Sequence, residues 1–285
     1  MICIIILYAI IYFNENSKEC KSNVVSEDPV NTPVIDSAYC EAVSSNSVKD
    51  NESEVKEDID SDLCIHASPT MRNGHMCVDL GTSVLWATCN VGSNNIPTSK
   101  GDFFSFGEVK PRKGTYSSIE YKKNRRVNYD TLPDKHLMLQ DDPAYVFWGG
   151  NWRTPTLSEV DELIDNCNYR WVKNYMNSGV EGCLISCRCK KNPKSIFIPV
   201  NGRFEVDSVE IQHSGIMNRN GVNLWTSSLD FNEHSWAREG EKSCYYVSIY
   251  DNDKDVYFNS LCSVLPYYSM PIRPVINKLH SPWRY

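Results

Sequence analysis

The sequence lacks the short motifs that mark several large classes of enzyme. It contains no Gly-x-Ser-x-Gly nucleophile turn, no Gly- and Lys-containing phosphate loop and no Gly-x-Gly-x-x-Gly dinucleotide fingerprint. Each of these motifs holds a nucleophile or a phosphate group in a fixed backbone geometry. We therefore predict no catalytic residue and no cofactor, and we expect a protein that is not an enzyme.

The sequence also has little positive charge. Its formal net charge is −7, and residues 14–75 contain 13 Asp and Glu against 5 Lys and Arg. The remainder of the chain is close to neutral, so it offers no field that would attract a nucleic acid. We predict no nucleic-acid partner.

Long apolar runs are scarce, and the one at the N-terminus is short. Residues 2–13 form an apolar run of 12 residues, which is short for a membrane-spanning helix but suits the core of a signal peptide. Residues 1–13 are interpreted as a signal peptide. Because no Lys or Arg precedes the run and no Ala-x-Ala site follows it, an N-terminal membrane anchor stays open as the alternative. We expect an extracytoplasmic protein, at the cell surface or secreted and possibly membrane-anchored.

Residues 14–75 contain no Trp and no Phe. Such a segment buries too little apolar surface to offset its ordering entropy, roughly 1–2 kcal/mol per residue. We predict a disordered acidic linker over residues 14–75.

Residues 76–278 alternate short apolar runs with turns. The runs at 77–81 and 84–92 are separated by Gly-Thr-Ser, a hairpin signal, and further strand-like runs follow to residue 276. Between them, Thr156 and Glu159 form a capping box that starts an amphipathic helix. We predict an α+β domain with short antiparallel strands and one or two helices, and a tail at 279–285.

Seven motifs of this region occur in an order that is seen in a known family. They are Val78–Gly81, Leu85–Gly92, Gly101–Glu108, Trp148–Thr156, Ser195–Pro199, Trp225–Ser228 and Ile272–Val275. Residues 76–278 thereby resemble the Fibrobacter succinogenes major paralogous domain. The resemblance implies a C-type-lectin-like fold, related to that of the formylglycine-generating enzymes (sulfatase-modifying factors), and export. It implies no established activity.

Aromatic and polar side chains in the last third of the chain are the candidate ligand contacts. We expect a glycan or a protein at the cell surface to be bound there, by a non-catalytic module. The candidate binding residues are Asp230, Asn232, His234, Trp236, Tyr267 and Tyr268. By contrast, Trp148, Trp152, Trp225 and Arg273 lie in the motifs that define the family, and we interpret them as core anchors.

Two other functions stay open. One is a thiol oxidoreductase, similar to the formylglycine-generating enzymes, that would act through Cys244 and Cys262. The other is a structural subunit of a surface fibre or coat.

No metal site is predicted. Cys183, Cys187 and Cys189 would face one side of a strand, but without a His partner at zinc-knuckle spacing we interpret them as small, half-buried hydrophobic residues or as part of a disulfide. The Asp-rich run at 251–255 lacks the Gly and Glu of a calcium loop, so we interpret it as a polar hairpin turn.

Overall fold

A computed structural model of the chain describes residues 69–112, 121, 127–189, 193–205, 215–217, 221–232, 242–252 and 255–278. The predicted leader at 1–13, most of the predicted linker and the tail at 279–285 lie outside the described residues. Within the described part of the chain, no helix is long and apolar enough to cross a membrane.

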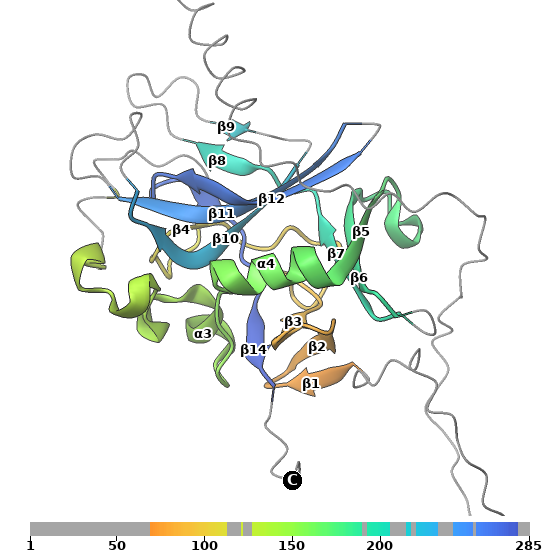
Figure 1. Ribbon diagram of the computed structural model, residues 1–285, viewed down its shortest axis with the longest axis horizontal. Coiled ribbons are helices and arrows are strands. Elements are labelled where there is room, and N and C mark those ends of the chain that lie inside the picture. Colours follow the sequence, from red (N-terminus) through yellow and green to blue (C-terminus); the bar gives the residue numbers. More distant parts are fainter. Residues whose placement is uncertain are drawn as a thin grey trace, which may run out of the picture.

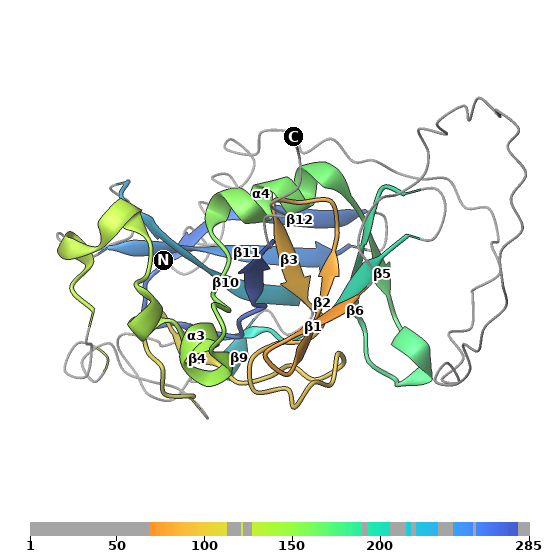
Figure 2. The ribbon, with the colours of Figure 1, turned by 90° about the horizontal axis from the view of Figure 1, so that it is seen from below.

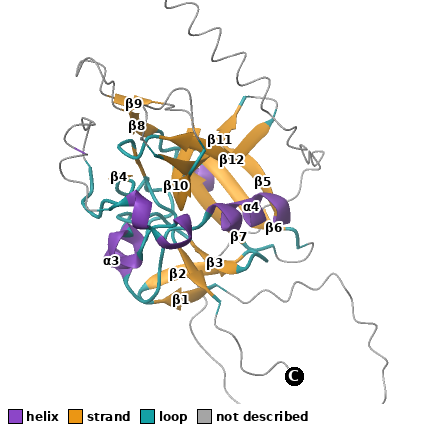
Figure 3. Ribbon diagram, turned by 60° about the vertical axis from the view of Figure 1, so that its left-hand side comes forward, coloured by secondary structure: helices purple, strands orange, loops and turns teal. Residues whose placement is uncertain are grey.

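In the part of the chain that the structure describes, strands dominate and form four sheets (Figures 1 and 3). The first contains, in spatial order, β1 (Thr70–Arg72), β2 (His75–Asp79), β3 (Val84–Ala87) and β14 (Val275–Asn277). The second contains β10 (Gly221–Asp230), β11 (Ser243–Asp251) and β12 (Val256–Val264). The third contains β4 (Phe104–Ser105), β13 (Ser269–Met270), β8 (Arg203–Glu205) and β9 (Gly215–Met217). The fourth contains β5 (Cys167–Val172), β6 (Gly182–Cys187) and β7 (Ser195–Pro199).

Helices are few in the described residues. The α-helices are α3 (Pro143–Trp148) and α4 (Leu157–Asn166), and the short 3-10 helices are η1 (Tyr129–Thr131), η2 (Pro133–Lys135), η3 (Leu139–Asp141) and η4 (Tyr175–Asn177). The strand pairs described are all antiparallel. The predicted class, short antiparallel strands with one or two helices, is therefore confirmed.

The predicted capping box starts α4. The Thr156 hydroxyl accepts a hydrogen bond from the Glu159 amide at 3.3 Å, and the Glu159 carboxylate accepts one from the Thr156 amide at 2.9 Å. The buried face of the helix presents Val160 and Leu163 to the β10–β12 sheet. Figures 1 and 2 show α4 and the sheet of β1–β3 and β14 side by side on the same side of the β10–β12 sheet, and residues of all three form one apolar cluster.

The β10–β12 sheet separates two apolar clusters. Alternate residues of its strands enter different clusters, because successive side chains of a strand point to opposite faces. The cluster on the α4 side includes Val222, Leu224, Val247, Ile249 and Phe258. The cluster on the other side includes Trp225, Leu229, Cys244, Tyr246 and Val264.

The folded unit begins earlier than the sequence predicts. Strand β1 lies inside the segment 14–75 that we expected to be linker, and it pairs with β2 through Met71 opposite Met76. The ring of His75 also stacks on that of Trp148, with centroids 3.7 Å apart. The prediction placed the boundary at residue 76 because Thr-Met-Arg is too short and polar to be recognised as a strand.

The predicted core anchors are confirmed. Trp148, Trp152, Trp225 and Arg273 are all buried. Arg273 donates hydrogen bonds to the Asn90 side chain at 2.8 Å, to the Ala87 carbonyl at 3.1 Å and to the Phe197 carbonyl at 2.9 Å. Burial lowers the pKa of this guanidinium to about 10, although Cys89 and Tyr175 oppose the shift, so the group is still charged at neutral pH.

Candidate functional site

Two of the predicted binding residues lie at the end of β10. Asp230 is buried, and its carboxylate accepts a hydrogen bond from the Asn232 amide at 2.9 Å. Asn232 is exposed, and its side chain donates to the Tyr245 hydroxyl at 3.4 Å. His234 and Trp236 lie outside the described residues.

The other two predicted residues lie between β12 and β13. Tyr267 is buried, with its ring against those of Tyr121 and Tyr268, and Tyr268 is half-buried against the same cluster. Because Asp230 and Tyr267 are buried, they have almost no exposed surface that a ligand could contact. Ligand contact by the predicted residues stays a prediction.

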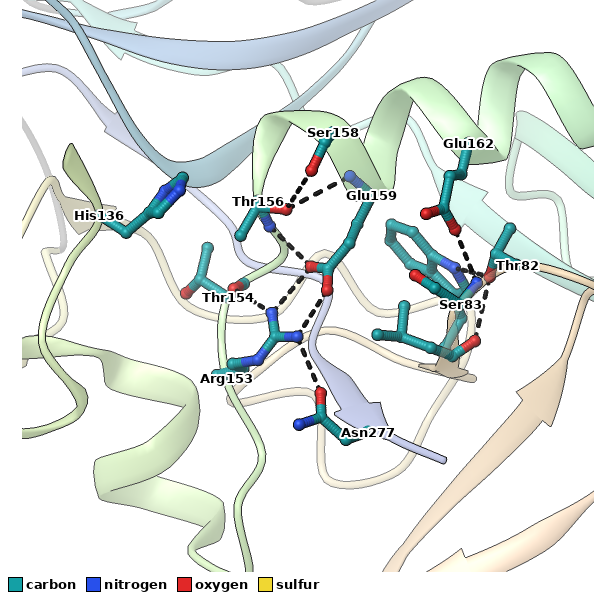
Figure 4. Close-up of polar contacts among 12 residues, drawn as sticks. Thr82, Ser83, His136, Arg153, Thr154, Thr156, Ser158, Glu159, Glu162 and Asn277 are labelled. Atoms are coloured by element: carbon teal, nitrogen blue, oxygen red, sulfur yellow. Dashed lines mark hydrogen bonds and ion pairs between the residues drawn. The ribbon is translucent and has the colours of Figure 1, made fainter. Parts of the chain in front are cut away.

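The turn before α4 is a closed polar network (Figure 4). Arg153 donates to both Glu159 oxygens, at 2.8 and 2.5 Å, and to the Asn277 side chain at 2.9 Å. Farther along the helix, Glu162 accepts a hydrogen bond from the Ser83 amide at 2.6 Å. These groups pair with one another, so the network braces α4 against the β3–β14 region and leaves little for a ligand.

A serine and a histidine meet beside this turn. The Nδ1 atom of His136 lies 3.0 Å from the Ser228 Oγ atom, which also accepts a hydrogen bond from the Leu157 amide at 2.9 Å. Ser228 is buried. Burial lowers the pKa of His136, although the carboxylates of Asp134 and Glu159 oppose the shift. Because the hydroxyl caps the first turn of α4, we assign the pair a structural role.

The two cysteines of the oxidoreductase hypothesis are poorly suited to thiolate chemistry. Cys244 is buried opposite Val264, and Cys262 lies opposite Tyr246, so they are not direct cross-strand partners. Burial raises the pKa of both thiols. A thiolate is the reactive form of cysteine, and a raised pKa depletes it at neutral pH.

The cysteines of β6 are core residues. Cys183 and Cys187 are buried, and Cys187 lies opposite Cys167 of β5. Burial raises the pKa of Cys183 to about 12. Among the residues that the structure describes, no group of three or more His, Cys, Asp or Glu side chains is placed to hold a metal ion.

An exposed pair of tyrosines lies at the tip of the β11–β12 hairpin. Tyr250 and Tyr257 face each other across the two strands, and their rings stack with centroids 5.0 Å apart and planes 13° apart. The residues are 39% and 40% exposed. On its other side Tyr250 lies opposite Gly221 of β10, which has no side chain to cover the ring.

The turn beneath the pair is held by its own polar groups. The Asn252 side chain donates to the Tyr257 hydroxyl at 3.3 Å and accepts from the Asp255 amide at 2.9 Å. The Asn252 amide donates to the Asp255 carbonyl at 3.3 Å. The predicted polar hairpin turn is thus confirmed, and it fixes the strand ends that carry the two rings.

The hydroxyl of Tyr250 is available as a neutral group. Burial raises its pKa, and the neighbouring Tyr257 and Cys262 add to the rise. It therefore stays protonated at physiological pH and can donate a hydrogen bond. Two stacked rings with a neutral hydroxyl and an adjacent amide combine an apolar surface with hydrogen-bonding groups.

Other exposed aromatic side chains are poorer candidates for ligand contact. The ring of Phe231 has the ammonium groups of Lys135 and Lys242 over it, 4.7 and 5.3 Å from its centroid. Tyr145 and Phe147 are exposed on α3, but no stacked partner ring or ordered turn accompanies them among the described contacts. The tyrosine pair is the better candidate surface.

The sequence prediction placed the ligand contacts at Asp230, Asn232, His234 and Trp236 and at Tyr267 and Tyr268, before and after the β11–β12 hairpin, and so missed this pair. The signal was present, since Tyr250 and Tyr257 flank the Asp251–Asp255 turn at positions that face each other once the hairpin closes. A hairpin turn places such flanking residues in direct cross-strand register.

The chain was also compared with known proteins. It matches no protein-family model, no curated protein and no solved structure.

Proposed function

We propose that this protein is an exported, non-catalytic binding module that holds a glycan on Tyr250 and Tyr257. One observation carries the proposal: two exposed tyrosine rings lie stacked at the end of a hairpin that is fixed by its own turn. A rigid aromatic surface binds with a low cost in conformational entropy, because a tyrosine side chain has few rotatable bonds.

The chemistry of the pair suits a sugar. A pyranose ring has an apolar face of C–H groups and a rim of hydroxyls. The apolar face packs against an aromatic ring, while the tyrosine hydroxyls and the Asn252 amide serve the rim. The acidic residues Asp251 and Asp255 of the adjoining turn favour a neutral glycan over an acidic one.

The proposal includes the family and the location expected from the sequence. The ordered motifs support membership of the Fibrobacter succinogenes major paralogous domain, with a C-type-lectin-like fold. The apolar run at 2–13 supports export, and the acidic composition up to about residue 68 supports a tether that presents the domain at the cell surface.

A glycan microarray probed with the full chain tests the proposal. We expect binding to a restricted set of neutral glycans, and we expect Tyr257→Ala to reduce the signal at least about tenfold, because aromatic contacts dominate such interfaces. Tyr145→Ala is the matched control, since Tyr145 is 36% exposed but lies on α3.

Two results would contradict different parts of the proposal. If the protein binds no glycan and instead assembles into fibres, the glycan-binding proposal is wrong and the result supports a structural subunit of a surface fibre or coat. If glycans bind equally well to wild type and Tyr257→Ala, the protein is a glycan-binding module but the tyrosine pair is not its site.

A further inference from the structure

β10 bonds to two other segments at the point where its pairing with β11 is irregular. The register of the two strands shifts between Trp225 and Leu229, and such an irregularity leaves backbone groups unpaired within the sheet. The Ser227 carbonyl accepts a hydrogen bond from the Leu137 amide at 3.0 Å, and the Ser227 amide donates one to the Pro155 carbonyl at 2.7 Å. The irregular stretch of β10 thus holds both the segment after η2 and the turn before α4.

The Ser228 hydroxyl is the polar centre of this junction. It accepts a hydrogen bond from the Leu157 amide at 2.9 Å and lies 3.0 Å from the Nδ1 atom of His136, which Figure 4 shows beside the first turn of α4. Ser228 is 4% exposed. Among the contacts of the described residues, His136 Nδ1 is the one acceptor for the hydroxyl proton. Because a buried hydroxyl needs an acceptor, the contact requires a neutral His136 with its own proton on Nε2.

Protonation of His136 removes that acceptor. Nδ1 then carries a hydrogen and becomes a second donor to the Ser228 oxygen, beside the Leu157 amide. The hydroxyl proton is left buried without a partner, which is unfavourable. The contact is therefore strong with a neutral imidazole and weak with a charged one.

We propose that His136 and Ser228 form a pH-sensitive clasp, which holds residues 136–138 and the first turn of α4 to β10 at neutral pH and releases residues 136–138 in acid. Leu137 and Met138 are partly buried against the apolar cluster that lies on the side of the β10–β12 sheet away from α4. Release exposes part of that cluster, while the pairing of β10, β11 and β12 persists. The clasp thus makes an apolar surface that depends on pH.

The clasp is independent of the proposed glycan site. Tyr250 lies opposite Gly221 at one end of the β10–β11 pair, whereas Ser228 lies close to the other end, just before Leu229. Failure of either proposal therefore leaves the other standing.

The charged groups around His136 decide where the ring titrates. Burial, the largest effect, lowers its pKa below the ordinary value of 6.5, and the guanidinium of Arg153 adds to this shift, while the carboxylates of Asp134 and Glu159 oppose it. A histidine with a lowered folded-state pKa stabilises its contact above about pH 6.5, and this contribution is lost as pH falls through the folded-state pKa. The clasp is therefore closed at neutral pH and opens in acid.

Two further charged side chains lie close by in the chain. The ammonium of Lys135 lies over the ring of Phe231, 4.7 Å from its centroid. Asp230, at the end of β10, accepts a hydrogen bond from the Asn232 amide at 2.9 Å. Neither is among the groups that shift the pKa of His136.

Amide hydrogen exchange of the full chain, followed by NMR from about pH 7.5 to about pH 5, tests the clasp. We expect the protection factors of the Leu137 and Leu157 amides, corrected for the intrinsic effect of pH, to fall at least about fivefold, while those of β11 stay constant. Glu159 stays ionised over this range, because its pKa is held below 4.5, so its pair with Arg153 does not cause the change.

Two variants separate the clasp from other titrations. His136→Gln keeps an oxygen that can accept from the Ser228 hydroxyl but does not titrate, so the protection of Leu137 and Leu157 should no longer depend on pH. His75→Gln is the matched control, since His75 is also half-buried but lies on β2, and the fall should persist in this variant.

Constant protection of Leu137 and Leu157 in the wild type overturns the proposal. So does a fall that is equally large in His136→Gln, a fall that His75→Gln abolishes, or an equal fall throughout β11, which would show unfolding of the sheet. The midpoint of the fall should coincide with that of the His136 ring signals in the wild type, and a difference of more than about one pH unit likewise excludes the clasp.

Discussion

The indole N–H of Trp152 donates a hydrogen bond to the backbone carbonyl of Arg72, 80 residues earlier, with nitrogen and oxygen 3.0 Å apart. The bond ties the first described strand to the turn that precedes α4. Because the Trp152 ring is fully buried, its N–H has no access to water, and the Arg72 carbonyl is the partner it needs. The N-terminal strand is thereby part of the core.

Disrupting β1 should destabilise the whole domain. We expect Met71→Pro to lower the free energy of unfolding by about 1–3 kcal/mol, because proline blocks the pairing of β1 with β2 and displaces the Arg72 carbonyl. Ser53→Pro, in the predicted linker, should have no effect. Urea unfolding of both variants measures the difference. Equal unfolding midpoints would show that β1 does not stabilise the domain and that the folded unit begins at residue 76.

The buried guanidinium of Arg273 should not be replaceable by an ammonium. Its three hydrogen bonds reach three separate acceptors, and a lysine cannot serve all of them. We expect Arg273→Lys to cost about 1–3 kcal/mol of stability for each buried acceptor that is left without a donor. Arg170→Lys, on the exposed side of β5, should change it by less than about 0.5 kcal/mol. A small loss for Arg273→Lys in thermal unfolding would contradict the assigned role.

The pairing of Arg153 with Glu159 should make stability fall in acid. Burial raises the pKa of the Glu159 carboxyl, but the hydrogen bond and charge of Arg153 outweigh burial and hold this pKa below its ordinary value of 4.5. A carboxyl with a depressed folded-state pKa stabilises the fold above its unfolded-state pKa, and the contribution disappears as pH falls through the folded-state pKa.

The Glu159→Gln variant measures this contribution. At neutral pH it should be less stable than wild type by about 1–3 kcal/mol, since it loses a hydrogen-bonded charge pair. The gap should close as pH falls below about 4.5, where wild type also loses the charge. A gap that is constant in denaturant unfolding from neutral to acidic pH would show that the charge contributes nothing.

The thiols of the β-sheets should react slowly in the native protein. Burial raises the pKa of Cys167 and Cys183 to about 12, with Cys187 adding to the rise at Cys167, and burial also raises the pKa of Cys262. We expect iodoacetamide to label these cysteines at neutral pH far more slowly than in denaturant, as peptide mass spectrometry can follow. Rapid native labelling of Cys262 would revive the oxidoreductase hypothesis.

The sequence correctly predicted elements that depend on interactions between residues close together in the chain. The capping box at Thr156 and Glu159 starts α4 in the structure as in the prediction, because both partners lie within one helical turn. The turn at Asp251–Asp255 was predicted for the same reason. Trp225 and Arg273 were recognised as core residues, because large side chains in fold-defining motifs are usually buried.

Features that depend on distant pairing were missed. β1 is three residues long, and only its partners in β2 and Trp152 identify it as a strand. Likewise, Tyr250 and Tyr257 become a surface only when β11 and β12 align, and Tyr267 is buried by residues from other parts of the chain. Sequence position alone does not reveal which aromatic side chain the fold leaves exposed.

Titration calorimetry with a glycan selected on the array tests the central claim most directly, that stacking on the tyrosine pair binds the ligand. The account predicts that Tyr250→Phe, which keeps the ring, retains affinity within about threefold, whereas Tyr250→Ala loses at least about tenfold, equivalent to about 1.4 kcal/mol. Equal affinities for wild type and Tyr250→Ala would contradict it.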